Sequence, residues 1–251
     1  MSKIVSIHSF RGGTGKSNLT ANLTALIAQT GKRVGVVDTD IQSPGIHVLF
    51  GLDEDKMHLA LNDYLWGRCS IEEAAYDVSH VLAPGTGGAI YLIPSSIRAG
   101  EIARVLREGY DVGLLNDGFH DLVQRLQLDY LMIDTHPGLN EETLLSIAIS
   151  DALLIILRPD QQDYQGTAVT VEVARRLEVP WLRMVVNKAL TSYDFTALRE
   201  QVEQTYGAPV VGILPESEDM LRLGSSAIFC LSFPDHPFTL RLRDIAAQVL
   251  A

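Results

Sequence analysis

Seven continuous apolar runs recur along the chain, and segments with helical periodicity lie between them. Continuous apolar runs are typical of parallel strands buried on both faces, whereas half-exposed strands alternate apolar and polar residues. We expect strands over residues 4–9, 34–38, 90–94, 130–134, 152–157, 183–187 and 210–213. We expect helices over residues 17–30, 97–108, 114–127, 141–149, 164–177, 194–206 and 238–250. This alternation predicts an α/β fold: a single doubly wound, mostly parallel sheet with helices on both faces and ligands at the carboxyl ends of the strands.

The region from residue 52 to 88 is less regular. Residues 59–67 and 71–74 predict a short helix, a turn and a second helix. Residues 84–88 read Pro-Gly-Thr-Gly-Gly, a run that predicts a turn. Because no Lys-Ser/Thr pair and no helical pattern follows this run, it does not predict a second phosphate-binding loop.

The composition is that of a cytoplasmic protein. The chain has 251 residues, of which 47% are apolar, enough for one domain over residues 1–251 with a full core. No apolar run reaches the roughly 18 residues of a membrane-spanning helix, and the first residues lead directly into a predicted strand, leaving no room for a signal peptide. Cys69 and Cys230 form no CxxC pair, which argues against a disulfide scaffold and for a reduced setting.

The net charge is −11, which counts against a broadly basic surface for nucleic acid. The net charge does not exclude a local basic patch on a dimer, so non-specific DNA binding is disfavoured rather than excluded. Acidic residues are mixed among the candidate arginines, which favours ordinary solvated helix faces over a DNA footprint. The candidates are Arg175, Arg176, Arg183, Arg241 and Arg243.

The strongest chemical signal is the segment Phe-Arg-Gly-Gly-Thr-Gly-Lys-Ser at residues 10–17. It follows an apolar run and precedes a helical one, which is the layout of a phosphate-binding loop. Its glycines let backbone N–H groups turn toward phosphate oxygens, Lys16 adds a positive charge, and Ser17 offers a hydroxyl to Mg²⁺. The nucleotide contacts predicted from this segment are Gly12, Gly13, Thr14, Gly15, Lys16, Ser17 and Asn18.

Three carboxylates follow predicted strands, at the edge of the sheet where the phosphate loop is expected. Asp38 and Asp40 belong to the run Val-Val-Asp-Thr-Asp, and Asp134 ends the strand 130–134. An apolar, buried strand that ends in an aspartate, whose carboxylate lies near the water shell of a bound metal, is a Walker B pattern. For Asp38 and Asp40, the alternative is that they only cap the turn that follows.

Together these motifs resemble those of a known family. Phe10 occupies the first glycine of the strict phosphate-loop pattern, but R-G-G-T-G-K-S is similar to the deviant Walker A motif K-G-G-x-G-K-[ST] of the MinD/ParA ATPases. The resemblance extends from Ile4 to about Phe238 and includes the motif D-x-x-P-G at residues 134–138. It implies a P-loop ATPase fold with ATP and Mg²⁺ as cofactors. The metal ligands it implies are Ser17, Asp40 and Asp134.

The same resemblance implies roles for individual residues. Asp40 matches the residue that orients the attacking water, and Asp38 matches one near the Mg²⁺ shell and the Lys16 ammonium. Gly138 would let the second switch segment move toward a γ-phosphate. His136 is a tempting general base, but the family needs none at that position, so local hydrogen bonding is the favoured interpretation.

Two later motifs resemble the part of the family's site that holds the nucleotide base. Asn187 ends the run Val-Val-Asn-Lys and resembles the residue whose amide reads the edge of adenine. The run Gly-Ile-Leu-Pro-Glu-Ser at residues 212–217 resembles the G-x-[IL]-P loop that covers the base. Pro215 and Glu216 are therefore expected to contact the nucleotide.

Arg11 stands where the family has a signature lysine, which crosses the dimer interface to the partner's nucleotide. Arginine keeps the positive charge and can donate hydrogen bonds to two oxygens at once. Arg11 is therefore expected either to act in trans as an arginine finger or to pair with an acidic residue in cis. Arg158, after another predicted strand, is a second candidate for reaching across the dimer. The alternative for Arg158 is a salt bridge to Asp160 or Asp163.

Two departures from relatives of this family limit the function further. The helix 238–250 has only Arg241 and Arg243 as basic residues, so it is expected to pack on the sheet and not to anchor in a membrane. Relatives of the nitrogenase iron-protein and Mrp types hold an iron–sulfur cluster through cysteine pairs. Cys69 and Cys230 do not match those positions, so no iron–sulfur cluster is expected.

The resemblance therefore implies a Mg–ATP-dependent ATPase switch that forms a homodimer with ATP. Turnover is expected to be slow until an activating adaptor protein stimulates it. The cargo to be positioned or partitioned would be a plasmid or chromosome, a protein organelle or a polar complex. The expected catalytic residues are Asp40, Lys16 and Arg11. The alternatives are a nucleotide-binding adaptor with little hydrolysis and a metal-cluster carrier ATPase.

Overall fold

Eight strands form one sheet in the computed structural model, which describes residues 2–251. Their order across the sheet is β3-β4-β2-β5-β1-β6-β7-β8, and every pairing is parallel except that of β3 with β4. The strands are β1 (Lys3–His8), β2 (Arg33–Asp38), β3 (Tyr76–Asp77), β4 (Ala89–Ile93), β5 (Tyr130–Asp134), β6 (Ala152–Leu157), β7 (Trp181–Ala189) and β8 (Val210–Pro215). The predicted mostly parallel sheet is confirmed.

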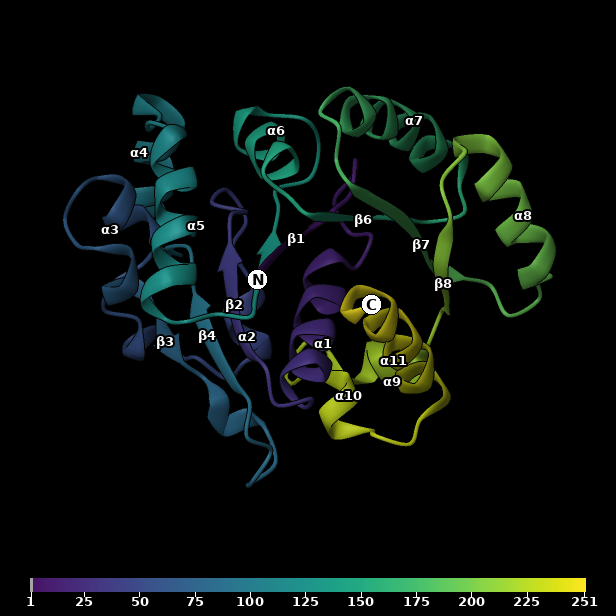
Figure 1. Cartoon of the computed structure of the whole chain (residues 1–251), viewed down its shortest axis with the longest axis horizontal. Coiled ribbons are helices and arrows are strands. Elements are labelled where there is room, and N and C mark those ends of the chain that lie inside the picture. Colours follow the sequence, from purple (N-terminus) through teal and green to yellow (C-terminus); the bar gives the residue numbers. More distant parts are fainter. Residues whose placement is uncertain (1) are drawn as a thin grey trace.

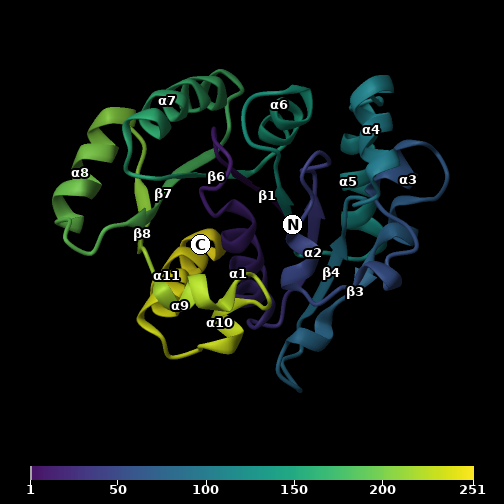
Figure 2. The same ribbon diagram turned by 180° about the vertical axis from the view of Figure 1, so that it is seen from behind.

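Helices cover both faces of the sheet, as a doubly wound fold requires (Figures 1 and 2). One face carries α1 (Lys16–Ala28), α2 (Ile46–Leu49), α9 (Glu218–Leu223), α10 (Phe229–Ser232) and α11 (Pro237–Leu250). The other carries α3 (Leu61–Leu65), α4 (Ala99–Glu108), α5 (Gly113–Arg125), α6 (Glu141–Ala148), α7 (Gln161–Arg176) and α8 (Phe195–Tyr206). Short 3₁₀ turns lie at Glu54–Lys56, Ile71–Ala74 and Ser79–Val81.

The core explains why the strands read as continuous apolar runs. All residues of β5 and β6 are buried, because helices pack against both of their faces. One apolar cluster lies between the sheet and α1 and α11, and two lie on the opposite face, under α5 and under α7 and α8. These clusters pack against both faces of the central strands, from which the loops of the carboxyl edge extend.

The last helix packs on the sheet as expected. Leu242, Ile245 and Val249 of α11 are buried against α1 and β8. The Nζ of Lys3 donates a hydrogen bond to the carbonyl of Val249 at 3.0 Å, so the end of α11 lies beside the start of β1. Within residues 2–251, no helix is both long enough and apolar enough to cross a membrane.

Some elements differ from the sequence-based expectations. Helix α7 begins at Gln161, three residues before the expected start, because the Asp160 carboxylate caps its first turn by accepting the Asp163 N–H. The second helix expected at residues 71–74 is a single 3₁₀ turn. The pattern also missed β3, α2, α9 and α10, which have six residues or fewer and are too short for a periodicity to develop.

The strand order brings the sequence motifs to one edge. Six strands that precede motifs are neighbours in the order β2-β5-β1-β6-β7-β8, and all six are parallel. Their carboxyl ends therefore lie along the same edge of the sheet. Asp38 at the end of β2 is in register with Asp134 at the end of β5, and Ile7 of β1 pairs with Asp134 on its other side.

Candidate functional site

The loop between β1 and α1 has a backbone that glycine makes possible. Gly13 and Gly15 have φ values of +75° and +96°, which other residues rarely adopt. A Cβ on Gly15 would also lie 2.4 Å from the Asn187 side-chain nitrogen. Helix α1 begins directly after Gly15 without a side-chain cap, so its first N–H groups are available to an anion. Gly12, Thr14, Ser17 and Asn18 occupy this loop and the first turn of α1, as expected.

Lys16 points into a buried cluster of carboxylates. Its Nζ lies 3.1 Å from the Asp134 Oδ1, and the Thr20 hydroxyl donates to the same oxygen at 3.2 Å. Asp38 is fully buried and accepts N–H groups from Asp40 at 3.0 Å and Gly45 at 3.2 Å. Burial, with the nearby Asp134 charge as a second cause, raises the pKa of Asp38 to about 8, although Lys16 opposes the rise.

This raised pKa predicts how stability depends on pH. The folded chain holds a proton on Asp38 that the unfolded chain has lost above its ordinary pKa of 3.8. The free energy of unfolding without nucleotide should therefore fall as pH rises from about 4 to about 8, by at most about 1.4 kcal/mol per pH unit. Asp38→Asn should flatten that slope in urea titrations between these pH values, whereas the exposed Asp55→Asn should not. An unchanged slope in Asp38→Asn would contradict this assignment.

Asp40 belongs to the loop after β2 and is held by the loop after β5. Its Oδ1 accepts a hydrogen bond from the His136 Nδ1 at 2.6 Å and from the Ser43 N–H at 3.2 Å. The local hydrogen bonding favoured for His136 is thus confirmed. Gly138, with φ +88°, donates its N–H to the Ser9 carbonyl at 3.1 Å, which ties the same loop to the start of the phosphate-binding loop.

Arg11 and Arg158 both pair in cis with Asp163. The Arg11 Nε lies 3.9 Å from the Asp163 Oδ1, and its Nη1 bonds the Gln162 side-chain oxygen. The Arg158 Nε lies 3.2 Å from the other oxygen of Asp163, and its Nη2 lies 3.2 Å from Asp160. Asp163 is buried, with 2% of its side chain exposed, whereas 39% of Arg11 is exposed. The alternative cis pairing of both arginines is therefore the arrangement observed.

Phe10, which replaces the first glycine of the strict loop pattern, packs against helix α7. A Cβ on Gly166 would lie 1.9 Å from the Phe10 ring, so the ring needs a glycine opposite it. The contact ties the phosphate-binding loop to the helix whose Asp163 and Gln162 hold Arg11. Nothing in the sequence pattern marked Gly166 for this role, because the two positions are far apart in sequence.

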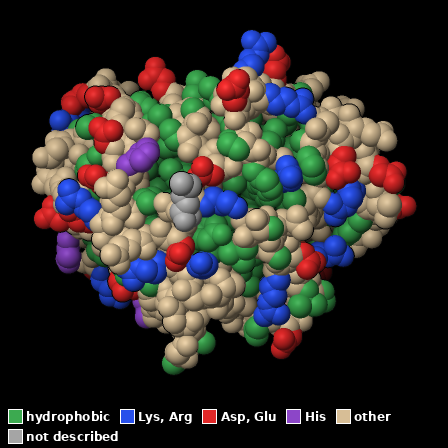
Figure 3. Space-filling model, in the orientation of Figure 1, with side chains coloured by type: hydrophobic (Ala, Val, Ile, Leu, Met, Phe, Trp, Pro, Cys, Tyr) green, Lys and Arg blue, Asp and Glu red, His purple; other side chains and the backbone are tan. Residues whose placement is uncertain are grey.

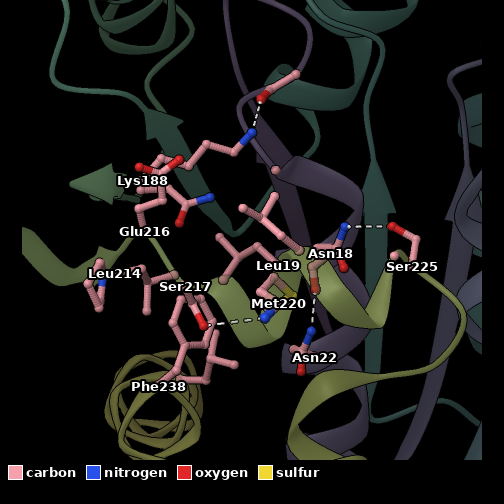
Figure 4. Close-up of a pocket in the computed structure, with 17 residues that line it drawn as sticks. Asn18, Leu19, Asn22, Lys188, Leu214, Glu216, Ser217, Met220, Ser225 and Phe238 are labelled. Atoms are coloured by element: carbon pink, nitrogen blue, oxygen red, sulfur yellow. Dashed lines mark hydrogen bonds between the residues drawn. The ribbon is translucent and has the colours of Figure 1, made fainter. Parts of the chain in front are cut away.

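Beside the phosphate-binding loop lies a pocket of about 320 Å³ (Figure 4). Residues Asn18 and Asn22 of α1 lie on one side of it, Glu216 and Ser217 on the other, and Phe238 of α11 below. The remaining lining residues are Gly13, Gly15, Leu19, Asn187, Lys188, Leu214, Pro215, Met220, Leu221, Gly224, Ser225 and Leu242. The pocket thus includes Asn187, Pro215 and Glu216, which the family resemblance assigns to contacts with the nucleotide base.

Asn187 is fixed by the phosphate-binding loop. Its side-chain nitrogen donates to the Thr14 carbonyl at 2.7 Å, and Lys188 donates to the Gly13 carbonyl at 2.8 Å. The Asn187 side-chain oxygen makes no hydrogen bond within residues 2–251, and Asn187 is one of the residues that line the pocket. The pocket therefore has a fixed hydrogen-bond acceptor at the end next to the loop.

Sequence reasoning missed the wall that α9 contributes. Met220, Leu221 and Ser225 line the pocket, and the Asn18 side chain reaches the Ser225 hydroxyl at 3.4 Å. A signal for this helix was present, because Ser217 accepts the Met220 N–H as an N-cap residue and Gly224 ends the helix with φ +58°. The helix is only six residues long, so its caps were the only sequence signal.

Four of the five candidate arginines for DNA have partners within their own chain, whereas the exposed Arg243 side chain has none in residues 2–251. Arg175 and Arg241 donate to backbone carbonyls, Arg176 pairs with Glu172, and Arg183 lies over the Trp181 ring. On the face shown in Figure 3, basic and acidic side chains are interspersed. Four of these arginines lie on helices α7 and α11, as expected, whereas Arg183 lies in strand β7.

The chain is similar in sequence to known nucleotide-binding proteins. The sequence profile described as the CobQ/CobB/MinD/ParA nucleotide binding domain matches residues 5–228. An uncharacterized ATP-binding protein of Methanocaldococcus jannaschii is 28% identical over 252 residues, covering 100% of this chain and 88% of that protein. An iron–sulfur cluster carrier protein of Methanococcus maripaludis is 30% identical over 74% of this chain but only 61% of its own length.

The fold agrees with that of solved structures. The septum site-determining protein MinD of Pyrococcus horikoshii, solved as a complex with Mg-ADP, superposes with a TM-score of 0.82. The alignment covers 99% of this chain and 96% of that chain, at 21% identity. At this identity, the likeness is one of fold.

Proposed function

We propose that this chain, which belongs to the CobQ/CobB/MinD/ParA nucleotide-binding family, is a cytoplasmic Mg–ATP-dependent ATPase switch. In this proposal residues 1–251 form one ATPase domain, which dimerises with ATP and positions or partitions a cellular cargo. The observation that carries the proposal is the meeting of Lys16, Asp134 and Asp40 at one sheet edge, beside a pocket of about 320 Å³.

The phosphate-binding loop and Lys16 would hold the phosphates of ATP. The loop follows β1 at the carboxyl edge of the sheet, where its N–H groups would bind phosphate oxygens. Lys16 would exchange its contact with Asp134 for these oxygens. Ser17, Asp40 and Asp134 present only oxygen donors, which suits Mg²⁺, and with the metal bound they would complete its shell directly or through water. Mg²⁺, when bound, neutralises charge on the transferred phosphate. Asp40 would orient the attacking water.

The pocket would take the nucleoside. Asn187 offers a side-chain oxygen as acceptor, which suits the amino group of adenine and is unfavourable opposite the O6 oxygen of guanine. Pro215 and Glu216 would contact the base or ribose from the other wall. ATP is therefore the nucleotide that the lining of the pocket favours.

Dimerisation would complete the site. In the proposed switch, Arg11 and Arg158 leave Asp163 and reach the phosphates of the partner subunit, where an arginine stabilises the developing charge. Because both cis pairs must be broken first, hydrolysis should be slow in the free protein. An adaptor protein that stabilises the released state would then stimulate turnover.

Calorimetric titration with ATP, ADP and GTP, followed by phosphate-release assays with and without Mg²⁺, tests the proposal. ATP and ADP should bind more tightly than GTP, and phosphate release should require Mg²⁺. Lys16→Ala should lose both properties, and the exposed Lys56→Ala should keep them. Tight ATP binding without any Mg²⁺-dependent release would favour a nucleotide-binding adaptor.

A cluster carrier is the competing proposal, because one relative has that name. The cysteines of this chain do not support it. Cys69 packs against the apolar cluster under α5, whereas Cys230 is buried in the cluster under α11, on the opposite face of the sheet. Iron bound to anaerobically purified protein would revive the carrier proposal.

A further inference from the structure

The Asp40 carboxylate is held through one oxygen only. Its Oδ1 accepts both the His136 Nδ1–H at 2.6 Å and the Ser43 N–H at 3.2 Å. Its Oδ2 has no hydrogen-bond partner in the described part of the chain, and the side chain is 13% exposed at the edge of the sheet. One oxygen is thus engaged by the protein, and the other is left for a water molecule.

The histidine that makes this contact is itself fixed. His136 follows the Walker B strand β5, and its backbone carbonyl accepts the Thr143 hydroxyl of α6 at 3.3 Å. Asn140 caps α6 by accepting the Thr143 N–H at 2.9 Å, so the loop is anchored at its far end. His136 therefore offers its Nδ1–H from a backbone that neighbouring elements hold in place.

Without this contact, the Asp40 carboxylate would have more freedom. Rotation about the last torsion of an aspartate is broad, because it joins sp³ and sp² atoms. The Ser43 N–H restrains one oxygen from within the same loop, whereas His136 restrains it from a different loop. Two donors from separate elements define where Oδ2 lies much better than one does.

We propose that His136 is a positioning residue for Asp40: its Nδ1–H holds Oδ1 so that Oδ2 faces the attacking water. This inference rests on the proposed ATPase function. A water-orienting group must be aligned closely, and a displacement of about 1 Å can cost up to about 100-fold in rate. His136 touches Asp40 and acts on the reaction only through it.

Steady-state ATP hydrolysis by His136→Ala and His136→Asn tests this role. His136→Ala should lower kcat by between about tenfold and 100-fold with KM within about twofold. His136→Asn should recover kcat to within about threefold of wild type, because its amide nitrogen can stand where the imidazole Nδ1 stands. The exposed His120→Ala on α5 is the matched control and should hydrolyse ATP like wild type.

Coupling to Asp40 separates positioning from a general loss of structure. In an Asp40→Asn background, His136→Ala should cause little further loss, because the contact it removes no longer orients a carboxylate. An independent loss in that background, a rise in KM alone, or an unchanged kcat in His136→Ala would overturn the inference.

Nuclear magnetic resonance of the histidine side chains gives a reading that does not need turnover. Wild type should show a protected Nδ1 proton for His136, and Asp40→Ala should lose it. Absence of that proton in wild type would overturn the inference even if the protein hydrolyses ATP. If the proton is present and wild type does not hydrolyse ATP, the proposed function fails and the positioning role fails with it. If wild type hydrolyses ATP and His136→Ala does so equally, only the inference fails.

Discussion

Replacing Asp40 with alanine should lower kcat for ATP hydrolysis by about 10²–10⁴-fold, the range expected when a group that activates the attacking water is removed. Nucleotide affinity should change by less than about threefold, because Lys16 and the phosphate-binding loop remain intact. Phosphate release at saturating ATP and calorimetric titration measure the two quantities separately.

The exposed Asp117→Ala on α5 is the matched control, and it should hydrolyse ATP like wild type. A large loss of affinity in Asp40→Ala would mean that the side chain holds the loop together and does not act in the reaction. Hydrolysis at the wild-type rate would remove Asp40 from the catalytic residues altogether.

Arg11→Ala should lower kcat by about 10³-fold or more if Arg11 acts as an arginine finger. Mixing subunits decides whether it acts in cis or in trans. In a heterodimer of Arg11→Ala and Asp40→Ala, one of the two sites has an intact Asp40 and receives Arg11 from the other subunit. An equal mixture should therefore recover about a quarter of wild-type activity, since half of the dimers are mixed and one site in each is complete.

If Arg11 acts in cis, every site in the mixture lacks one of the two residues, and activity should not recover. Arg176→Ala is the matched control for loss of an exposed arginine, because Arg176 pairs only with Glu172 of α7 among residues 2–251. Full activity of Arg11→Ala alone would show that the pair with Asp163 is the whole role of this side chain.

Much of the fold was predictable because its strands are buried on both faces. The runs 130–134 and 152–157 predict strands with the observed bounds, since β5 is apolar up to its last residue, Asp134, and β6 is apolar throughout and is followed by Arg158. Starts of helices were less predictable. The start of α7 depended on Asp160, whose capping role is a matter of local backbone geometry rather than of hydrophobic pattern.

The candidate site also has parts that could be predicted from the sequence and parts that could not. Motifs after strands could be found because each is contiguous, and parallel strands bring their carboxyl ends together. Contacts between loops could not be found, because they depend on strand order. Asp40 follows β2 and His136 follows β5, and only the insertion of β5 between β2 and β1 makes them neighbours. The shared partner of Arg11 and Arg158 is known only from the position of α7 over the phosphate-binding loop.

In the proposed function, ATP converts separate subunits into a dimer and hydrolysis reverses this. Size-exclusion chromatography with light scattering, on wild type and Asp40→Ala with ADP or with ATP and Mg²⁺, tests this cycle. Both proteins should have the mass of one chain with ADP, and Asp40→Ala should have twice that mass with ATP for as long as the nucleotide lasts. A mass of one chain in every condition, with ATP demonstrably bound, would contradict the proposed ATP-dependent dimer.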